Sequence, residues 1–212
     1  MSNYIFNETT LCGKQSFAFW DKTIEDFGEC FQSIIIVCPV HVVLAILSAY
    51  FVGIRSTQYA IRTPIQSAAL RLRIASSVLL GVMPVIATVV INSIDYTSAI
   101  AADGLSEIIE TIVKFVAWLL HAVFCYLLIE KRIGPSARGP QSMIFVWCMC
   151  AVANIIKSRS ILMTVQPDSD ADKALFADAI LTLTGLCLYL VSFVPGGDDG
   201  DSSYEELITN EN

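Results

Sequence analysis

Residues 31–54 read FQSIIIVCPVHVVLAILSAYFVGI, and this stretch decides the fold. It contains no Asp, Glu, Lys or Arg. A helix needs about 20 residues to cross the hydrocarbon core of a bilayer, at about 1.5 Å per residue. An open strand would leave backbone groups unpaired in lipid, and the stretch lacks the apolar–polar alternation of a membrane barrel. The sequence therefore predicts a transmembrane helix here.

Further apolar runs follow along the chain. They cover about 72–91, 108–129, 142–163 and 174–194. The fourth of the five runs is short before Lys157 and Arg159 interrupt it, so it spans the bilayer only if its helix continues past these charges. We predict an all-α, polytopic membrane protein built as a bundle of five transmembrane helices.

The composition agrees with a membrane domain flanked by polar tails. The chain of 212 residues is 55% hydrophobic and 16% charged, whereas a soluble domain carries about 25% charged residues. We divide it into an N-terminal tail at 1–30, a transmembrane domain at 31–194 and an acidic linker at 195–212. The tail lacks a basic start and an apolar core, so we expect no signal peptide and a permanent first span. The net charge of -7 lies largely in the tails, and without a basic stripe no nucleic-acid partner is expected.

Basic residues in the loops predict the orientation. The loops after the first and third spans hold Arg55, Arg62, Arg71 and Arg73, and Lys131, Arg132 and Arg138. The loop after the second span holds Asp95, Asp103 and Glu107 and no base. Because Lys and Arg collect on the cytoplasmic side, we expect the N-terminus outside and the C-terminus in the cytoplasm. The fourth loop mixes Lys157, Arg159 and Lys173 with three aspartates; because acids contribute little to this rule, it argues mildly against the predicted orientation.

The N-terminal tail carries two features that suit an extracellular position. Asn7-Glu8-Thr9 is a glycosylation sequon, so Asn7 is a candidate acceptor. Cys12 and Cys30 would share the same oxidising compartment, where a disulfide would close the tail into a loop at the start of the first span. Two free thiols are the alternative. The other five cysteines lie in apolar runs and are expected to pack as small apolar residues.

Charged residues within the spans are candidates for an intramembrane site. Glu110 and Lys114 are four residues apart and share a helix face. They suit either an ion pair that faces the bundle or a polar relay that contacts a substrate. Asp178 has a similar depth in the fifth span and could join them as a clamp between the third and fifth helices.

The remaining polar side chains in the spans are His41, His121 and Asn154. Neither histidine belongs to a full set of Cys, His or carboxylate ligands at ligand spacing, so packing or interhelical hydrogen bonds are expected rather than a metal. The sequence contains no G-x-S-x-G, H-E-x-x-H or CxxC motif, and no G-x-x-x-x-G-K-[ST] loop for ATP. We therefore expect no enzyme activity and no cofactor in this chain.

Several stretches, in this order, resemble one family. They are Leu11-Cys12-Gly13, Phe19-Trp20, Cys30-Phe31, the run PVHVVLAILSAYFVG at 39–53, Arg71-Leu72-Arg73-Ile74-Ala75-Ser76 with Pro84, and Arg138-Gly139-Pro140. Together they are similar to the extra N-terminal five-helix domain of subfamily C ABC transporters, the multidrug resistance-associated proteins. The resemblance covers nearly the whole chain, most clearly 11–84.

The resemblance implies a function and a set of partners. It implies that Cys12 pairs with Cys30, that Asn7 is glycosylated, and that the domain serves trafficking, docking and partner contact. Full-length members export organic anions, conjugates and drugs with ATP and Mg²⁺, which bind in nucleotide-binding domains that this chain lacks. The partners implied are membrane lipid, the transporter core of the same polypeptide and another membrane protein, in a plasma, lysosomal or vacuolar membrane. The alternatives are a small channel or transporter with a path through Glu110, Lys114, Asp178 and Asn154, and an intramembrane enzyme using His121.

Overall fold

The computed structural model describes residues 11–12, 17–21, 26–55, 68–94, 104–131, 141–165, 168 and 170–192. Five long helices account for most of them. The elements are α2 (Glu29–Phe31), η1 (Gln32–Val37), α3 (Cys38–Arg55), α4 (Ala68–Ile94), α6 (Gly104–Lys131), α7 (Gln141–Thr164) and α8 (Asp170–Val191). The sequon at Asn7, the linker at 195–212 and half of the ten loop charges that predict the orientation (Arg62, Asp95, Asp103, Arg132 and Arg138) lie outside the described residues.

Five helices in this part of the chain are long and apolar enough to span a membrane, which confirms the all-helical, five-span prediction. The apolar spans are Glu29–Gly53, Arg71–Ile91, Leu105–Leu127, Ser142–Met163 and Asp172–Val191. The fourth continues through Lys157 and Arg159 to the end of α7 at Thr164. These two charges therefore do not end the helix. The orientation across the bilayer stays a prediction.

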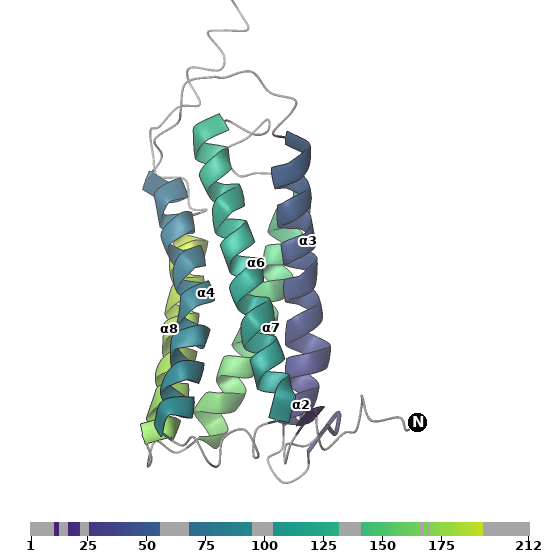
Figure 1. The fold of residues 1–212 in the computed structure, drawn as a ribbon, viewed down its shortest axis with the longest axis vertical. Coiled ribbons are helices and arrows are strands. Elements are labelled where there is room, and N and C mark those ends of the chain that lie inside the picture. Colours follow the sequence, from purple (N-terminus) through teal and green to yellow (C-terminus); the bar gives the residue numbers. More distant parts are fainter. Residues whose placement is uncertain are drawn as a thin grey trace, which may run out of the picture.

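The five helices form a closed ring (Figure 1). In the ring, α3 packs against α6, α6 against α4, α4 against α8, α8 against α7, and α7 against α3. At one end of the ring, α4 is tied to α8 by Arg73. Its Nε donates to Ser192 Oγ at 3.0 Å and its Nη2 to the Ser192 carbonyl at 3.2 Å. The other end is where α2 begins, and the candidate site lies there.

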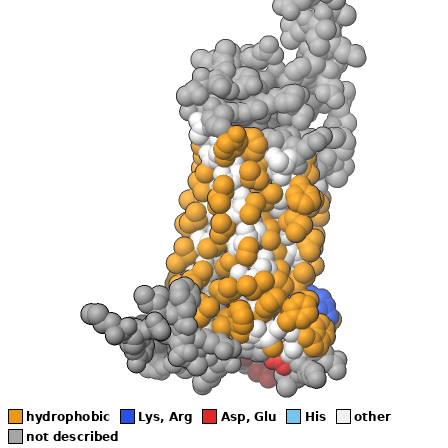
Figure 2. Space-filling view, turned by 90° about the vertical axis from the view of Figure 1, so that its right-hand side faces the viewer, with side chains coloured by type: hydrophobic (Ala, Val, Ile, Leu, Met, Phe, Trp, Pro, Cys, Tyr) orange, Lys and Arg blue, Asp and Glu red, His pale blue; other side chains and the backbone are white. Residues whose placement is uncertain are grey.

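The interior of the ring is filled by large side chains, of which Trp118 lies midway along α6 and Tyr189 near the end of α8. Trp147 and Tyr189 stack with ring centroids 4.7 Å apart, and Trp118 contacts Tyr189 edge-on. All three rings are buried. The outward faces carry mostly hydrophobic side chains, as expected of helices that contact lipid (Figure 2).

The first span begins with an unusual turn. Residues Gln32–Val37 form a π-helix, in which the Cys38 N–H bonds to the Ser33 carbonyl five residues back. Pro39 follows the π-helix after Cys38 and has no N–H to donate to a carbonyl of the preceding turn. A wider turn before the proline leaves fewer backbone carbonyls without a donor. The buried Gln32 and Ser33 side chains of this turn reach α7.

Gly185 shows how closely α8 and α4 pack. A Cβ atom at this position would lie 3.0 Å from Leu80 Cδ2, whereas a Cβ at Gly53 would meet nothing within 4 Å. We expect Gly185→Ala to lower the free energy of unfolding by about 1–3 kcal/mol through overpacking. The matched Gly53→Ala change should be neutral or raise it by up to about 1 kcal/mol through helix propensity. SDS titration of the protein in mixed micelles measures both, and equal effects would contradict this packing.

Candidate functional site

Glu110 and Lys114 of α6 form a buried ion pair inside the ring. Lys114 Nζ lies 2.7 Å from Glu110 Oε1. The two residues are 5% and 7% exposed, so both charges are almost removed from solvent. Because an isolated charge in an apolar interior is costly, each depends on its partner. The structure thus places them as an ion pair that faces the bundle.

Lys157 of α7 completes the charge cluster, and the sequence analysis did not identify it as part of a site. Its Nζ lies 3.3 Å from Glu110 Oε2 and donates a hydrogen bond to Ser33 Oγ at 2.8 Å. The Glu110 carboxylate therefore pairs with two lysines, and the cluster links α6, α7 and η1. The sequence did contain a signal for Lys157: it is a lysine within an apolar span. It lies about as far from the end of its span as Glu110 lies from the start of its own.

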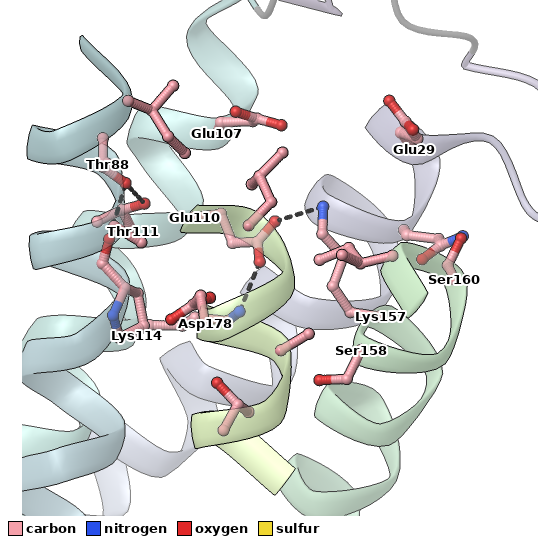
Figure 3. A pocket seen from close by; sticks show the side chains of 18 of the residues that line it. Glu29, Thr88, Glu107, Glu110, Thr111, Lys114, Lys157, Ser158, Ser160 and Asp178 are labelled. Atoms are coloured by element: carbon pink, nitrogen blue, oxygen red, sulfur yellow. Dashed lines mark hydrogen bonds and ion pairs between the residues drawn. The ribbon is translucent and has the colours of Figure 1, made fainter. Parts of the chain in front are cut away.

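A cavity of about 190 Å³ surrounds this cluster. It lies where α2, α6 and α8 begin and α4 and α7 end (Figure 1). Four acidic, two basic and five hydroxyl side chains line it together with apolar ones: Glu29, Glu107, Glu110, Asp178, Lys114, Lys157, Thr88, Thr111, Thr182, Ser158 and Ser160. Figure 3 shows Glu29 and Glu107 to one side of the Glu110–Lys157 pair.

Asp178 lines the same cavity but does not form the predicted clamp. Among the described residues, no ion pair within 4.0 Å joins it to Lys114 or Lys157. Its Oδ1 atom is buried and has no hydrogen-bond partner there. The interhelical clamp runs from α6 to α7 through Lys157, instead of from α6 to α8.

Asn154 and His41 form a separate network between α7 and α3. His41 Nδ1 donates to the Val37 carbonyl at 2.8 Å, which leaves Nε2 to accept from Asn154 Nδ2 at 3.2 Å. Asn154 Nδ2 also donates to the Cys150 carbonyl at 2.8 Å. Neither residue lines the cavity. The structure assigns both side chains to helix packing, as expected of polar residues between membrane helices.

His121 lies in the aromatic layer of the core. Its Nε2 is hydrogen-bonded to the Tyr189 hydroxyl, and Cys125 Sγ lies 3.6 Å away. His121 is buried and is not among the residues that line the cavity. In the described part of the chain, no group of three or more His, Cys, Asp or Glu side chains could hold a metal ion.

The N-terminal segment is fastened to the same end of the ring. A disulfide joins Cys12 to Cys30, and both residues are buried. Asp26 is paired with Arg159 of α7 at 3.3 Å, and Gln32 Nε2 donates to Ser160 Oγ at 3.1 Å. The segment therefore lies beside the cavity, to which Gln32 and Ser160 contribute.

Comparison with known proteins identifies one similar protein with curated function. The chain is 29% identical over 209 residues to human ATP-binding cassette sub-family C member 10. The match covers 93% of this chain and 13% of that protein. No family model and no solved structure matches. The five membrane-length helices and this similarity together indicate an integral membrane protein similar to part of a subfamily C ABC transporter.

Proposed function

We propose that this chain is an accessory N-terminal membrane domain of an ATP-driven subfamily C exporter, and that it acts in trafficking, docking and partner contact. The observation that carries the proposal is the similarity over 93% of the chain to only 13% of a much longer ABC transporter. Within the family we infer the greatest likeness to the seventh multidrug resistance-associated protein. Catalytic transport would reside in other parts of such a protein.

The packing of the ring supports docking more than translocation. The charged cavity occupies only one end of the ring. One turn further along α6 from Lys114, the buried Trp118 packs in the apolar core together with Trp147 and Tyr189. Asn154 is the fourth residue of the hypothetical polar path, but it bonds to His41 outside the cavity. Purified protein in liposomes should therefore show no flux of ions or organic anions, and measurable flux would favour the channel alternative.

The parent protein would supply the energy and the cargo path. By family resemblance we propose that it binds ATP and Mg²⁺ in nucleotide-binding domains and exports organic anions, conjugates and drugs. The chain itself would contact lipid, the transporter core and another membrane protein. We place it in the plasma membrane or in a lysosomal or vacuolar membrane. Removing residues 1–212 from the parent should mislocalise the transporter, whereas unchanged localisation and partner binding would contradict an accessory role.

The orientation is a separate prediction of this proposal. An epitope placed before residue 11 should react with antibody on intact cells, and an epitope after residue 212 should react only after permeabilisation. The positive loop residues, such as Arg62 and Arg132, are the physical reason. A cytoplasmic N-terminal epitope would contradict both the orientation and glycosylation of Asn7. Mobility of the Asn7→Gln protein on gels, with and without glycosidase, tests that site directly.

A further inference from the structure

We propose that an aromatic cluster at the start of the first span binds the surface of the bilayer, with its exposed rings seated among the lipid headgroups. The cluster consists of Phe17, Phe19, Trp20, Phe27 and Phe31. The inference concerns this part of the chain alone and does not depend on whether the chain belongs to an exporter. It rests on the exposure of the rings, on the bonds that hold them, and on their place beside the lipid-facing surface.

The cluster gathers around Phe31, which belongs to α2 at the end of the ring shown in Figure 1. The ring centroids of Phe17 and Phe19 lie 6.1 and 5.4 Å from that of Phe31. Phe27 stacks on Phe31 at 6.4 Å, and Trp20 contacts Phe27 edge-on at 5.7 Å. Even so, Phe17, Phe19 and Trp20 are 39%, 67% and 50% exposed. A contiguous apolar patch of this kind marks a surface that contacts a membrane or another protein.

Hydrogen bonds hold the cluster in a fixed position at the end of the ring. The Gly28 N–H donates to the Ala18 carbonyl at 3.1 Å, which joins the two parts of the chain that carry the rings. Gln32 Nε2 donates to the Phe27 carbonyl at 2.8 Å, and the disulfide at Cys30 adds a covalent tie. The exposed rings are therefore already arranged before they meet a partner, which lowers the cost of binding.

The surroundings of the cluster favour lipid as the partner. Phe31 lies within the apolar span Glu29–Gly53, so the cluster has the level at which this helix enters the bilayer. Ile35, about one turn further into the span, is 48% exposed and continues the apolar surface toward the hydrocarbon core. Asp26, an acid that would resist contact with lipid, is only 4% exposed and is paired with Arg159 of α7.

The types of ring fit the boundary between lipid and water. Trp20 has an apolar ring system and one N–H group, and such amphipathic rings collect where membrane helices meet the headgroups. Its half-exposed ring can contact acyl chains while the N–H donates to a headgroup or ester oxygen. Phe19 has no polar group and gains from contact with the acyl chains alone. Lipid contact at this level therefore explains why the two rings remain outside the protein core.

Quenching of tryptophan fluorescence in the full chain tests the proposal. The chain has three tryptophans, and Trp118 and Trp147 are 1% and 3% exposed inside the ring. The emission of the Trp20→Phe protein is subtracted from that of the natural sequence, so the difference reports Trp20. In phosphatidylcholine nanodiscs, a nitroxide lipid labelled near its headgroup should remove roughly half of this emission, because interfacial rings lie at headgroup level. A lipid labelled at its chain end should remove less, and aqueous iodide should remove little.

A lipid-facing reference calibrates the depth of the ring. Val152→Trp, made in the Trp20→Phe protein, places an indole midway along α7 at a position that is 53% exposed. This indole should be quenched most by the chain-end label, the reverse of the order for Trp20. The same order for both indoles would place Trp20 in the hydrocarbon core and overturn the proposal. Strong quenching by iodide alone would place the cluster in water, and protection from all three quenchers would mean that protein covers it; either result would also overturn the proposal.

Discussion

Replacing Glu110 by Gln is expected to lower the free energy of unfolding by about 3–5 kcal/mol, because it leaves buried lysine charge without a counter-ion. Glu110 is the only acid within 4.0 Å of Lys114 or Lys157 among the described residues. The change keeps the side-chain volume, so lost packing does not explain the effect. SDS titration of the protein in mixed micelles gives the free energy of unfolding for each variant.

Two further variants separate the charge effect from other causes. Asp170 and Lys173 form an exposed pair at 2.8 Å, in which Lys173 lowers the pKa of Asp170 through a hydrogen bond and its charge. Asp170→Asn should therefore change stability little, because solvent screens such a pair. Combining Glu110→Leu with Lys114→Met and Lys157→Met should recover most of the loss. A Glu110→Gln protein as stable as the Asp170→Asn protein would contradict the charge clamp.

Replacing Cys30 by Ser is the second change with a large expected effect. The disulfide to Cys12 spans a sequence separation of 18 residues, and closing a loop of this size stabilises a protein by about 3 kcal/mol. The lost bridge should loosen the N-terminal segment, although Asp26 still pairs with Arg159, and should impair folding or export from the endoplasmic reticulum. Glycan maturation and the cell-surface fraction, measured in cells expressing the full chain, report the defect.

Free cysteines provide the control for this prediction. Cys148 and Cys187 are exposed thiols within α7 and α8, and their serine variants should mature normally. Cys12→Ser should reproduce the Cys30→Ser defect, and the double variant should be no worse than either single one. Normal maturation of the Cys30→Ser protein would argue against a structural role for the bridge.

The helices could be predicted because lipid leaves few alternatives. Long apolar runs must satisfy their backbone groups internally, so all five spans follow from length and composition. The fourth was ambiguous because Lys157 and Arg159 resemble a loop boundary. In the structure, Lys157 turns inward to Glu110 and Arg159 pairs with Asp26. Both contacts join residues that lie far apart in the sequence. The sequence of one span alone therefore does not show that its charges have partners.

The candidate site was predicted only in part, for the same reason. The spacing of Glu110 and Lys114 fixes a shared helix face, and the structure places them as a pair. Nothing in the local sequence says which neighbour in the ring each face meets. Asp178 was therefore expected to join the pair, whereas in the structure it lines the same cavity without an ion pair to Lys114 or Lys157. Asn154 was expected to make an interhelical hydrogen bond, and it bonds to His41.

Isolation of the natural protein with an antibody against this chain, followed by mass spectrometry, tests the central claim most directly. The account predicts a polypeptide much larger than 23.2 kDa, with peptides from nucleotide-binding domains in the same chain as residues 1–212. The match to only 13% of an ABC transporter is the basis for this expectation. A polypeptide of about 23 kDa, isolated without any ABC transporter core, would contradict the proposal that the chain serves an exporter.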